Sequence, residues 1–189
     1  VSFTSADTTV TDDTKVTNHA ETTLALTKKK PTAIGPKGSN VTYSLTPTIT
    51  SGTLGPNRGK LAVVNTKLVD KLPSCAVYVS ATSQGSTDGS EFTGAEPTYD
   101  AATHSLTWDL GTMVPNVVTL TINVTLNYPT TCADTTVTNT ATVTGSPYGD
   151  PTKTAAANSS VSHDFADRVT YGGTFSKNAL QQFKRGQNG

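Results

Sequence analysis

The segment Leu120-Thr121-Ile122-Asn123-Val124-Thr125-Leu126 decides the fold, because apolar and polar residues alternate along its whole length. Successive side chains of a β-strand point to opposite faces, so this alternation is typical of a strand that buries one face. Related patterns occur at 41–45, 61–72, 76–82, 106–110 and 137–143, with turn-forming residues between them. This many short, regularly spaced strands predict an all-β protein with an immunoglobulin-like β-sandwich.

The composition agrees with strands rather than helices. Of 189 residues, 38 are Thr and 17 are Val, both β-branched and suited to a pleated surface. Only 15% are charged and the formal net charge is zero, which argues against nucleic acid as a partner. No stretch approaches the length of apolar sequence that a transmembrane helix needs. The first residues lack a signal-peptide pattern, so either a signal was already removed or the chain is cytosolic.

Two cysteines, Cys75 and Cys132, each lie beside a turn-like segment. They are not spaced as a CxxC pair, and His19, His104 and His163 are scattered, so no metal site is predicted. A disulfide formed in an oxidising compartment is the preferred interpretation, and two buried free thiols are the alternative. No motif predicts a cofactor, and no hydrolase pattern such as GxSxG or HExxH is present, so an enzyme is the least favoured class.

Three polar residues interrupt faces that are otherwise apolar. Lys28 extends the face of Leu24 and Leu26, Asp70 lies in register with apolar residues of 61–72, and Asn139 does so in 137–143. Such local inconsistencies are often functional or strained. The structural alternatives are that the strand ends at Lys28, which then points to solvent, and that Asn139 is a buried amide satisfied by backbone groups.

The run from residue 40 to residue 145 resembles a family of bacterial surface repeats, the DUF11-type repeat and the related isopeptide-forming D2 domain of Gram-positive fimbriae. Six segments carry the resemblance in the expected order, and they are NVTYSL (40–45), LVDKLP (68–73), VYVSAT (77–82), LTWDLG (106–111), LTINV (120–124) and VTNTATV (137–143). Each segment is common in β-proteins, and the specificity lies in their order and spacing.

The resemblance implies an extracellular or cell-surface protein with a structural or adhesive role, in which domains are strung end to end. Members with an internal isopeptide bond join a Lys of the first strand to an Asn of the last strand, assisted by an acid. The matching positions here are Lys28, Asn139 and Asp70. Burial would lower the pKa of the lysine and raise that of the acid, which would leave a neutral amine beside a protonated carboxyl group.

The predicted organisation has three parts. Residues 1–23 form a polar N-terminal arm, 24–147 form the sandwich, and 148–189 form a Pro-, Ala- and Ser-rich linker with a C-terminal extension, in which 178–185 could make one or two helical turns. One interpretation is a fragment of a repeat array, in which neighbouring repeats are the partners. The other is a subunit whose arm adds as a strand to the next copy, giving a head-to-tail homopolymer. A disordered terminus explains the arm equally well.

Two further sequence features bear on a surface role. Asn40, Asn123 and Asn158 match the N-glycosylation pattern, and Asn158 is the favoured candidate because it lies in the predicted linker. The predicted loop at 83–103 and the exposed end of the sandwich support the alternative function, an adhesin module that binds a glycan or a matrix protein. The principal prediction is a structural subunit or repeat of an extracellular filament.

Overall fold

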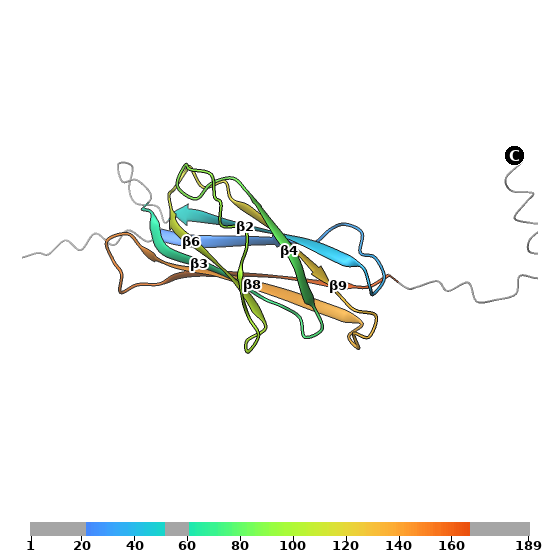
Figure 1. Cartoon of the computed structure of the whole chain (residues 1–189). Helices are drawn as coiled ribbons and strands as arrows, with labels where there is room; N and C mark the ends of the chain where they lie inside the picture. Colours follow the sequence, from blue (N-terminus) through green and yellow to red (C-terminus); the bar gives the residue numbers. More distant parts are fainter. Residues whose placement is uncertain (1–21, 52–60, 167–189) are drawn as a thin grey trace, which may run out of the picture.

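The computed structural model describes residues 22–51 and 61–166, and within these ranges the chain forms nine strands and no helix (Figure 1). The strands are β1 (Thr22–Lys29), β2 (Asn40–Ser51), β3 (Val63–Lys71), β4 (Val77–Gln84), β5 (Thr98–Asp100), β6 (Ser105–Met113), β7 (Thr121–Asn127), β8 (Thr136–Pro147) and β9 (Ala155–Asp164). The predicted all-β sandwich is confirmed.

The strands form two antiparallel sheets that pack face to face. One sheet has the order β1-β2-β7-β4, and the other has the order β5-β6-β3-β8-β9. The segment 120–126 lies in the middle of the first sheet, where β7 pairs with β2 on one side and with β4 on the other. The apolar residues of this segment alternate because one face of the strand packs against the opposite sheet.

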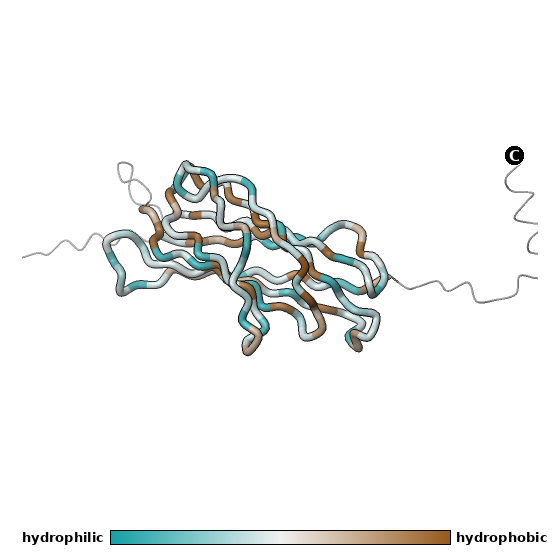
Figure 2. Tube along the Cα trace, viewed as in Figure 1, coloured by the Kyte–Doolittle hydropathy of each residue, from teal (hydrophilic) through white to brown (hydrophobic). Residues whose placement is uncertain are grey.

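The core lies between the sheets and is built from the alternating apolar positions. Apolar and polar residues alternate along most strands (Figure 2). Leu120, Ile122, Val124 and Leu126 are all fully buried, and Trp108 lies in the same core. The indole Nε1 of Trp108 donates a hydrogen bond to the carbonyl oxygen of Ala95 at 2.8 Å, which satisfies its only polar atom.

The sandwich continues beyond residue 147, where the sequence predicted a linker. β9 pairs with β8 over its whole length, from Thr136↔Asp164 to Gly145↔Ala155. The Ala- and Ser-rich composition suggested a flexible segment because small polar residues are common in linkers. These small side chains instead fit a strand that lies close beside β1 of the other sheet. The domain boundary and the linker assignment for residues 155–164 are therefore wrong.

The two ends of the described sandwich lie far apart. β1 begins at the end of the sandwich that carries the β8–β9 turn, and β9 finishes at the opposite end (Figure 1). The predicted arm lies outside the described residues except for Thr22 and Thr23, which belong to β1. The predicted helical turns at 178–185 also lie outside them. The predicted 83–103 loop contains the short strand β5 and a bridge between Ser86 and Glu91.

Candidate functional site

The three polar residues singled out in the sequence meet in the core. Lys28 lies on β1, Asp70 on β3 and Asn139 on β8, with exposed fractions of 4%, 0% and 0%. The strand does not end at Lys28, because β1 continues to Lys29 and its alternation turns Lys28 inward. β1 belongs to one sheet and β3 and β8 to the other, so the cluster spans the interface between the sheets.

Asp70 is the centre of the cluster. The Lys28 Nζ donates to Asp70 Oδ1, and the Asn139 Nδ2 donates to Asp70 Oδ2 at 3.4 Å. The second contact lies beyond the usual range for a hydrogen bond between nitrogen and oxygen. Among the buried side-chain nitrogen and oxygen atoms of the described residues, Asn139 Oδ1 alone has no hydrogen-bond partner. A buried polar atom without a partner is costly, so this amide is the least satisfied group in the core.

Burial shifts the pKa values of both the lysine and the aspartate toward their neutral forms. Burial lowers the pKa of Lys28, while the charge of Asp70 and its hydrogen bond act in the opposite direction. Burial raises the pKa of Asp70, against the attraction of Lys28 and the hydrogen bonds from Lys28 and Asn139. Desolvation is the largest cause for both groups, since taking a charge out of water is expensive. Proton transfer from Lys28 to Asp70 converts a buried ion pair into a neutral amine and a carboxylic acid.

This arrangement supplies the parts of an acyl transfer. A neutral Lys28 is a nucleophile, the Asn139 side chain offers an amide carbon, and a protonated Asp70 is an acid that touches both. Rotation of the Asn139 amide by 180° exchanges its oxygen and nitrogen. The unpartnered Oδ1 would then accept a hydrogen bond from protonated Asp70, which polarises the carbonyl toward attack.

A ring of aromatic side chains adjoins the cluster. The Lys28 Nζ lies 5.4 Å from the ring centre of Tyr43, and the Tyr43 hydroxyl is 2.7 Å from the Tyr128 hydroxyl and 2.6 Å from His163 Nε2. Phe165 packs against Tyr128 and His163. Sequence reasoning missed this network. Tyr43 alternates with apolar residues like any core residue, and His163 lay beyond the predicted domain boundary.

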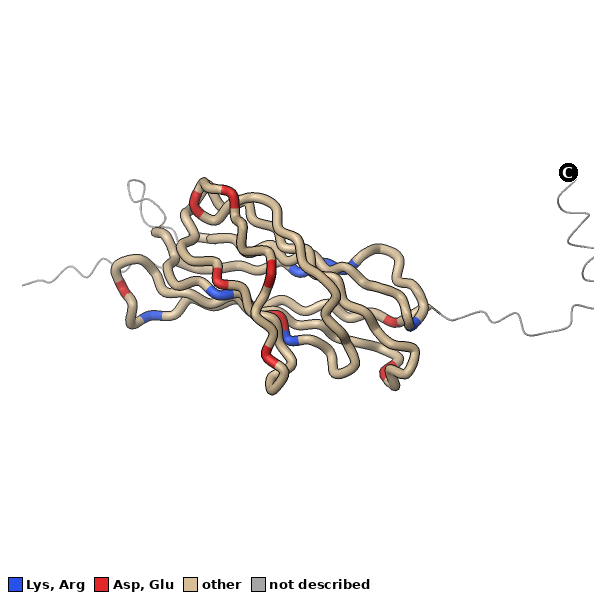
Figure 3. Tube along the Cα trace, viewed as in Figure 1, with Lys and Arg blue, Asp and Glu red and all other residues tan. Residues whose placement is uncertain are grey.

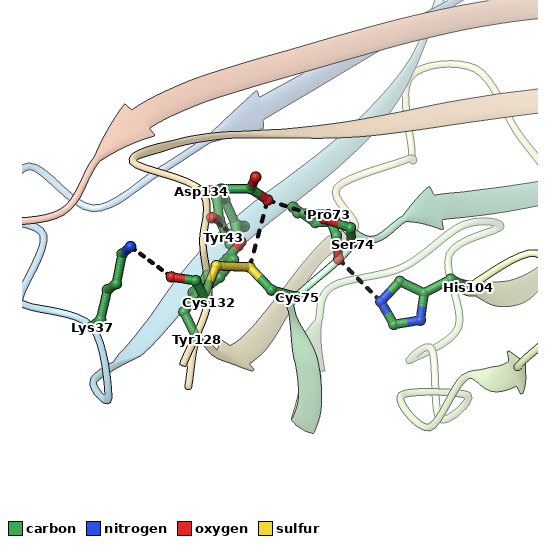
Figure 4. The surroundings of a disulfide bond; sticks show 9 residues. All are labelled: Lys37, Tyr43, Pro73, Ser74, Cys75, His104, Tyr128, Cys132 and Asp134. Atoms are coloured by element: carbon green, nitrogen blue, oxygen red, sulfur yellow. Dashed lines mark hydrogen bonds between the residues drawn. A yellow bond between two sulfur atoms is a disulfide. The ribbon is translucent and has the colours of Figure 1, made fainter. Parts of the chain in front are cut away.

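The two cysteines form a disulfide (Figure 4), with their Cα atoms 5.4 Å apart. Cys75 lies in the connection from β3 to β4 and Cys132 in the connection from β7 to β8, so the bond ties together two segments that cross between the sheets. The Lys37 Nζ donates to the carbonyl oxygen of Cys132 at 2.7 Å. Asp134 lies near both sulfurs, but sulfurs bonded to each other cannot serve as thiolate ligands for a metal.

The glycosylation candidates lie on strands. Asn40 and Asn158 are exposed on β2 and β9, and Asn123 is half-buried on β7. Asn40 is also engaged with its neighbour, because its Oδ1 accepts a hydrogen bond from Asn127 Nδ2 at 2.9 Å. Asn158 therefore does not occupy a linker as predicted, although it is exposed. Glycosylation at these positions stays a prediction.

The surface carries few charges, and neither sign gathers in one region of the described chain (Figure 3). This distribution agrees with the zero net charge and offers no basic face that would follow a phosphate backbone. A search of the described residues finds no helix that is long and apolar enough to span a membrane.

Solved structures share the fold at low sequence identity. The full-length major pilin SpaD from Corynebacterium diphtheriae matches with a TM-score of 0.51 and 13% identity, over 76% of this chain and 35% of that one. Domains D2 and D3 of the same pilin match with a TM-score of 0.50 and 14% identity, over 74% of this chain and 52% of that one. The chain thus spans about a third to a half of the pilin structures it matches.

The similarity is confined to the fold. The sequence matches no protein-family model and no curated protein. Both of these structures are of a pilin, as the fimbrial part of the resemblance implies. The DUF11-type part of the resemblance stays a prediction.

Proposed function

We propose that the chain is a structural domain of an extracellular fibre or cell-surface protein, and that it strengthens itself with an isopeptide bond between Lys28 and Asn139. The buried contact of Lys28 and Asn139 with one carboxyl group carries this proposal. The shared pilin fold supports it. The disulfide agrees with an oxidising environment such as the cell exterior. The reaction occurs once in each molecule, so the chain turns over no substrate.

The proposed reaction transfers the acyl group of Asn139 to Lys28. The neutral Nζ attacks Cγ of Asn139, and a carbon–nitrogen bond forms while the carbonyl is polarised by protonated Asp70. Protonated Asp70 gives its proton to the departing Nδ2 and takes one from the attacking nitrogen, so its own protonation state is restored. The bond from Cγ to Nδ2 breaks, and one ammonia leaves. Lys28 and Asn139 end as a secondary amide, and no external reactant is consumed.

The position of the bond suits a mechanical role. The bond would join β1 of one sheet to β8 of the other, near the two ends of the sandwich sequence. Force applied through the two ends of the described chain would otherwise be carried between β1 and β8 by hydrogen bonds and apolar contacts alone. A covalent link between β1 and β8 passes the load around the intervening strands instead.

Intact mass of the purified chain tests the bond. Samples are denatured and reduced first, so that the disulfide does not alter the mass. The expected mass is about 17 Da below the sequence mass, which corresponds to one ammonia. The variants Lys28→Met, Asp70→Ala and Asn139→Ala should show no such loss, and Lys29→Met is the matched control because Lys29 is exposed on the same strand. A wild-type chain with an unshifted mass would contradict the proposal.

Assembly is the second part of the proposal. The described chain enters and leaves the sandwich at opposite ends, a geometry that allows copies or neighbouring repeats to be strung head to tail (Figure 1). The predicted arm, residues 1–23, supplies the proposed donor strand for a neighbouring copy from its residues before Thr22, because Thr22 and Thr23 pair with β2 of the same chain. Negative-stain microscopy over a range of concentrations should show polymers of the full chain. Monomers at every concentration would remove homopolymer assembly and leave the repeat interpretation.

An adhesin module is the second candidate function, and one surface favours it. Val77, Val79 and Tyr99 are large apolar side chains that are exposed. Val77 and Tyr99 line a depression of about 280 Å³, together with Tyr78 and His104. Binding of the monomer to a glycan array or to matrix proteins, abolished by Tyr99→Ala, would favour this function over assembly.

A further inference from the structure

β9 covers the proposed crosslinking site. Its inward positions nearest the site are Ser159, Val161 and His163, of which the first two are half-buried and the last is buried. The Ser159 Oγ accepts a hydrogen bond from the backbone N–H of Lys28 at 3.1 Å. Val161 lies directly opposite Asn139 in the β8–β9 register. This strand, the last in the described chain, therefore contacts or flanks both residues that would be joined.

His163 connects β9 to the other sheet through a chain of hydroxyl groups. Burial raises the pKa of Tyr128 to about 12 and raises that of Tyr43 further, so both phenols are protonated donors. Burial lowers the pKa of His163, which favours its neutral form. With His163 neutral and Nε2 unprotonated, Tyr43 donates to His163 Nε2 and Tyr128 donates to Tyr43, and the other tautomer reverses both bonds. The other ring nitrogen, Nδ1, then faces the carbonyl oxygen of Asp164 at 3.4 Å.

Tyr43 links this chain to the reacting lysine. Its ring lies 5.4 Å from the Lys28 Nζ, and the ring and the Tyr128 side chain are fully buried. The neutral amine that the reaction needs depends on excluding water from this side of Lys28. The hydrogen bond to His163 holds Tyr43 in place there, so the environment of Lys28 depends on a residue of β9.

We propose that His163 is a positioning residue for the crosslink, and that the bond between Lys28 and Asn139 forms only after β9 has docked on β1 and β8. This inference rests on the proposed crosslinking function. It gives the reaction an order, because the last described strand must complete the sandwich before the covalent bond fixes it. A chain with β9 undocked would keep Lys28 solvated, charged and unreactive.

Protonation of His163 should interrupt this control. A protonated imidazole donates at Nε2 instead of accepting, so the hydrogen bonds through Tyr43 and Tyr128 would have to reverse, and a charged ring would be buried when β9 docks. The titratable or charged groups around His163 are Tyr43 on β2, Tyr128 after β7, Lys30 after β1 and Asp164 on β9, with the Lys28–Asp70 pair beyond Tyr43. Burial outweighs the favourable effect of Asp164, so acid should slow the reaction.

The test follows crosslinking of the full chain by mass during refolding from denaturant, between about pH 5 and pH 8. His163→Phe fills the space but cannot accept a hydrogen bond, and it should slow ammonia loss about tenfold at pH 7.5, the effect expected for one lost hydrogen bond. His163→Gln offers an amide oxygen in place of Nε2. This variant should lose ammonia at close to the wild-type rate at pH 7.5. Its rate should not fall at acid pH as the wild-type rate does. Ser162→Ala, at an exposed position of β9, is the matched control.

The outcomes separate the two levels of the proposal. A wild-type chain that never loses ammonia contradicts the crosslink itself and this inference with it. A wild-type chain that crosslinks, together with a His163→Phe variant that reacts at the same rate, overturns only the role of His163. If His163→Phe fails to fold, as judged by Trp108 fluorescence, His163→Gln still decides. Retention of the wild-type acid slowing in His163→Gln would overturn the role.

Discussion

Asp70 is the residue on which the site depends, because it touches both Lys28 and Asn139 and all three side chains are buried. Lys28, Asp70 and Asn139 could be identified from the sequence because each interrupts an otherwise regular apolar face. Alternation alone did not predict their mutual contact, since it gives the face of a strand but not which strands oppose one another, and the sequence implied this contact only through the family resemblance. Tyr43 and His163 gave no such signal. A tyrosine suits a core position, and His163 lay in a segment without apolar alternation.

Removal of the lysine should make stability depend on pH through Asp70. In Lys28→Met no crosslink can form, and the pKa of Asp70, already raised by burial, loses the opposing effect of the lysine charge. The folded pKa then lies above the unfolded value of about 3.9, so the unfolded state binds fewer protons than the folded state between these values. The free energy of unfolding should therefore be greatest below about pH 3.9 and fall as the pH rises through the folded pKa.

Urea unfolding of Lys28→Met from about pH 4 to pH 8 measures this slope. The double variant Lys28→Met/Asp70→Asn is the control, because it has no ionisable group at the centre of the cluster and should lose the dependence assigned to Asp70. A single variant whose stability rises with pH over this range would contradict the raised pKa of the buried aspartate.

The alternation of apolar and polar residues predicted most strands of the sandwich, and β9 is the exception. The strands β7 and β8 could be predicted from the sequence because one face of each is apolar. The strand β9 could not be predicted in this way, because its inward positions include Ala157, Ser159 and His163 and its outward ones are small and polar. It therefore lacks the alternation of large apolar and polar residues. What fixes β9 is pairing with β8 and close packing beside β1, and neither is encoded in its own pattern.

Gly145 tests the close packing of β8 against β3, at the end of the β8–β9 pair next to the turn. It lies opposite Ala155, and a Cβ atom at this position would press against Val63 Cγ1 and lie 3.0 Å from Thr66 Oγ1. Both neighbours are buried on β3, which leaves little room to adjust. Gly145→Ala should lower the free energy of unfolding by about 1–3 kcal/mol, as expected for overpacking. Thr144→Ala, a half-buried neighbour on the same strand, is the control, and equal urea midpoints for the two variants would contradict the packing argument.

The whole molecule has one disulfide and one proposed isopeptide bond, and the segment closed by the first lies inside the segment closed by the second. The disulfide closes the segment from Cys75 to Cys132. The proposed isopeptide bond closes the larger segment from Lys28 to Asn139, which contains it. A pulling force applied at the chain ends would therefore meet the isopeptide bond first. The nesting follows from the order of these four residues in the sequence. The end-to-end loading could not be predicted from the sequence, because it depends on β9 leaving the sandwich at the end opposite the start of β1.

Nesting leads to a quantitative prediction for forced unfolding. The segment between positions 28 and 139 holds about 110 residues, which at about 3.3–3.6 Å each amounts to roughly 360–400 Å of extended chain. Under reducing conditions, single-molecule pulling of the full chain should therefore release about this much more length from Asn139→Ala than from the wild type. In Asn139→Ala, an intact disulfide should shorten the released length by about 57 residues, or roughly 190–205 Å. In the crosslinked wild type the disulfide lies inside the closed segment, so its reduction should leave the released length unchanged. A wild-type chain that lengthens on reduction would show that force reaches the segment between Lys28 and Asn139, and hence that no bond joins them.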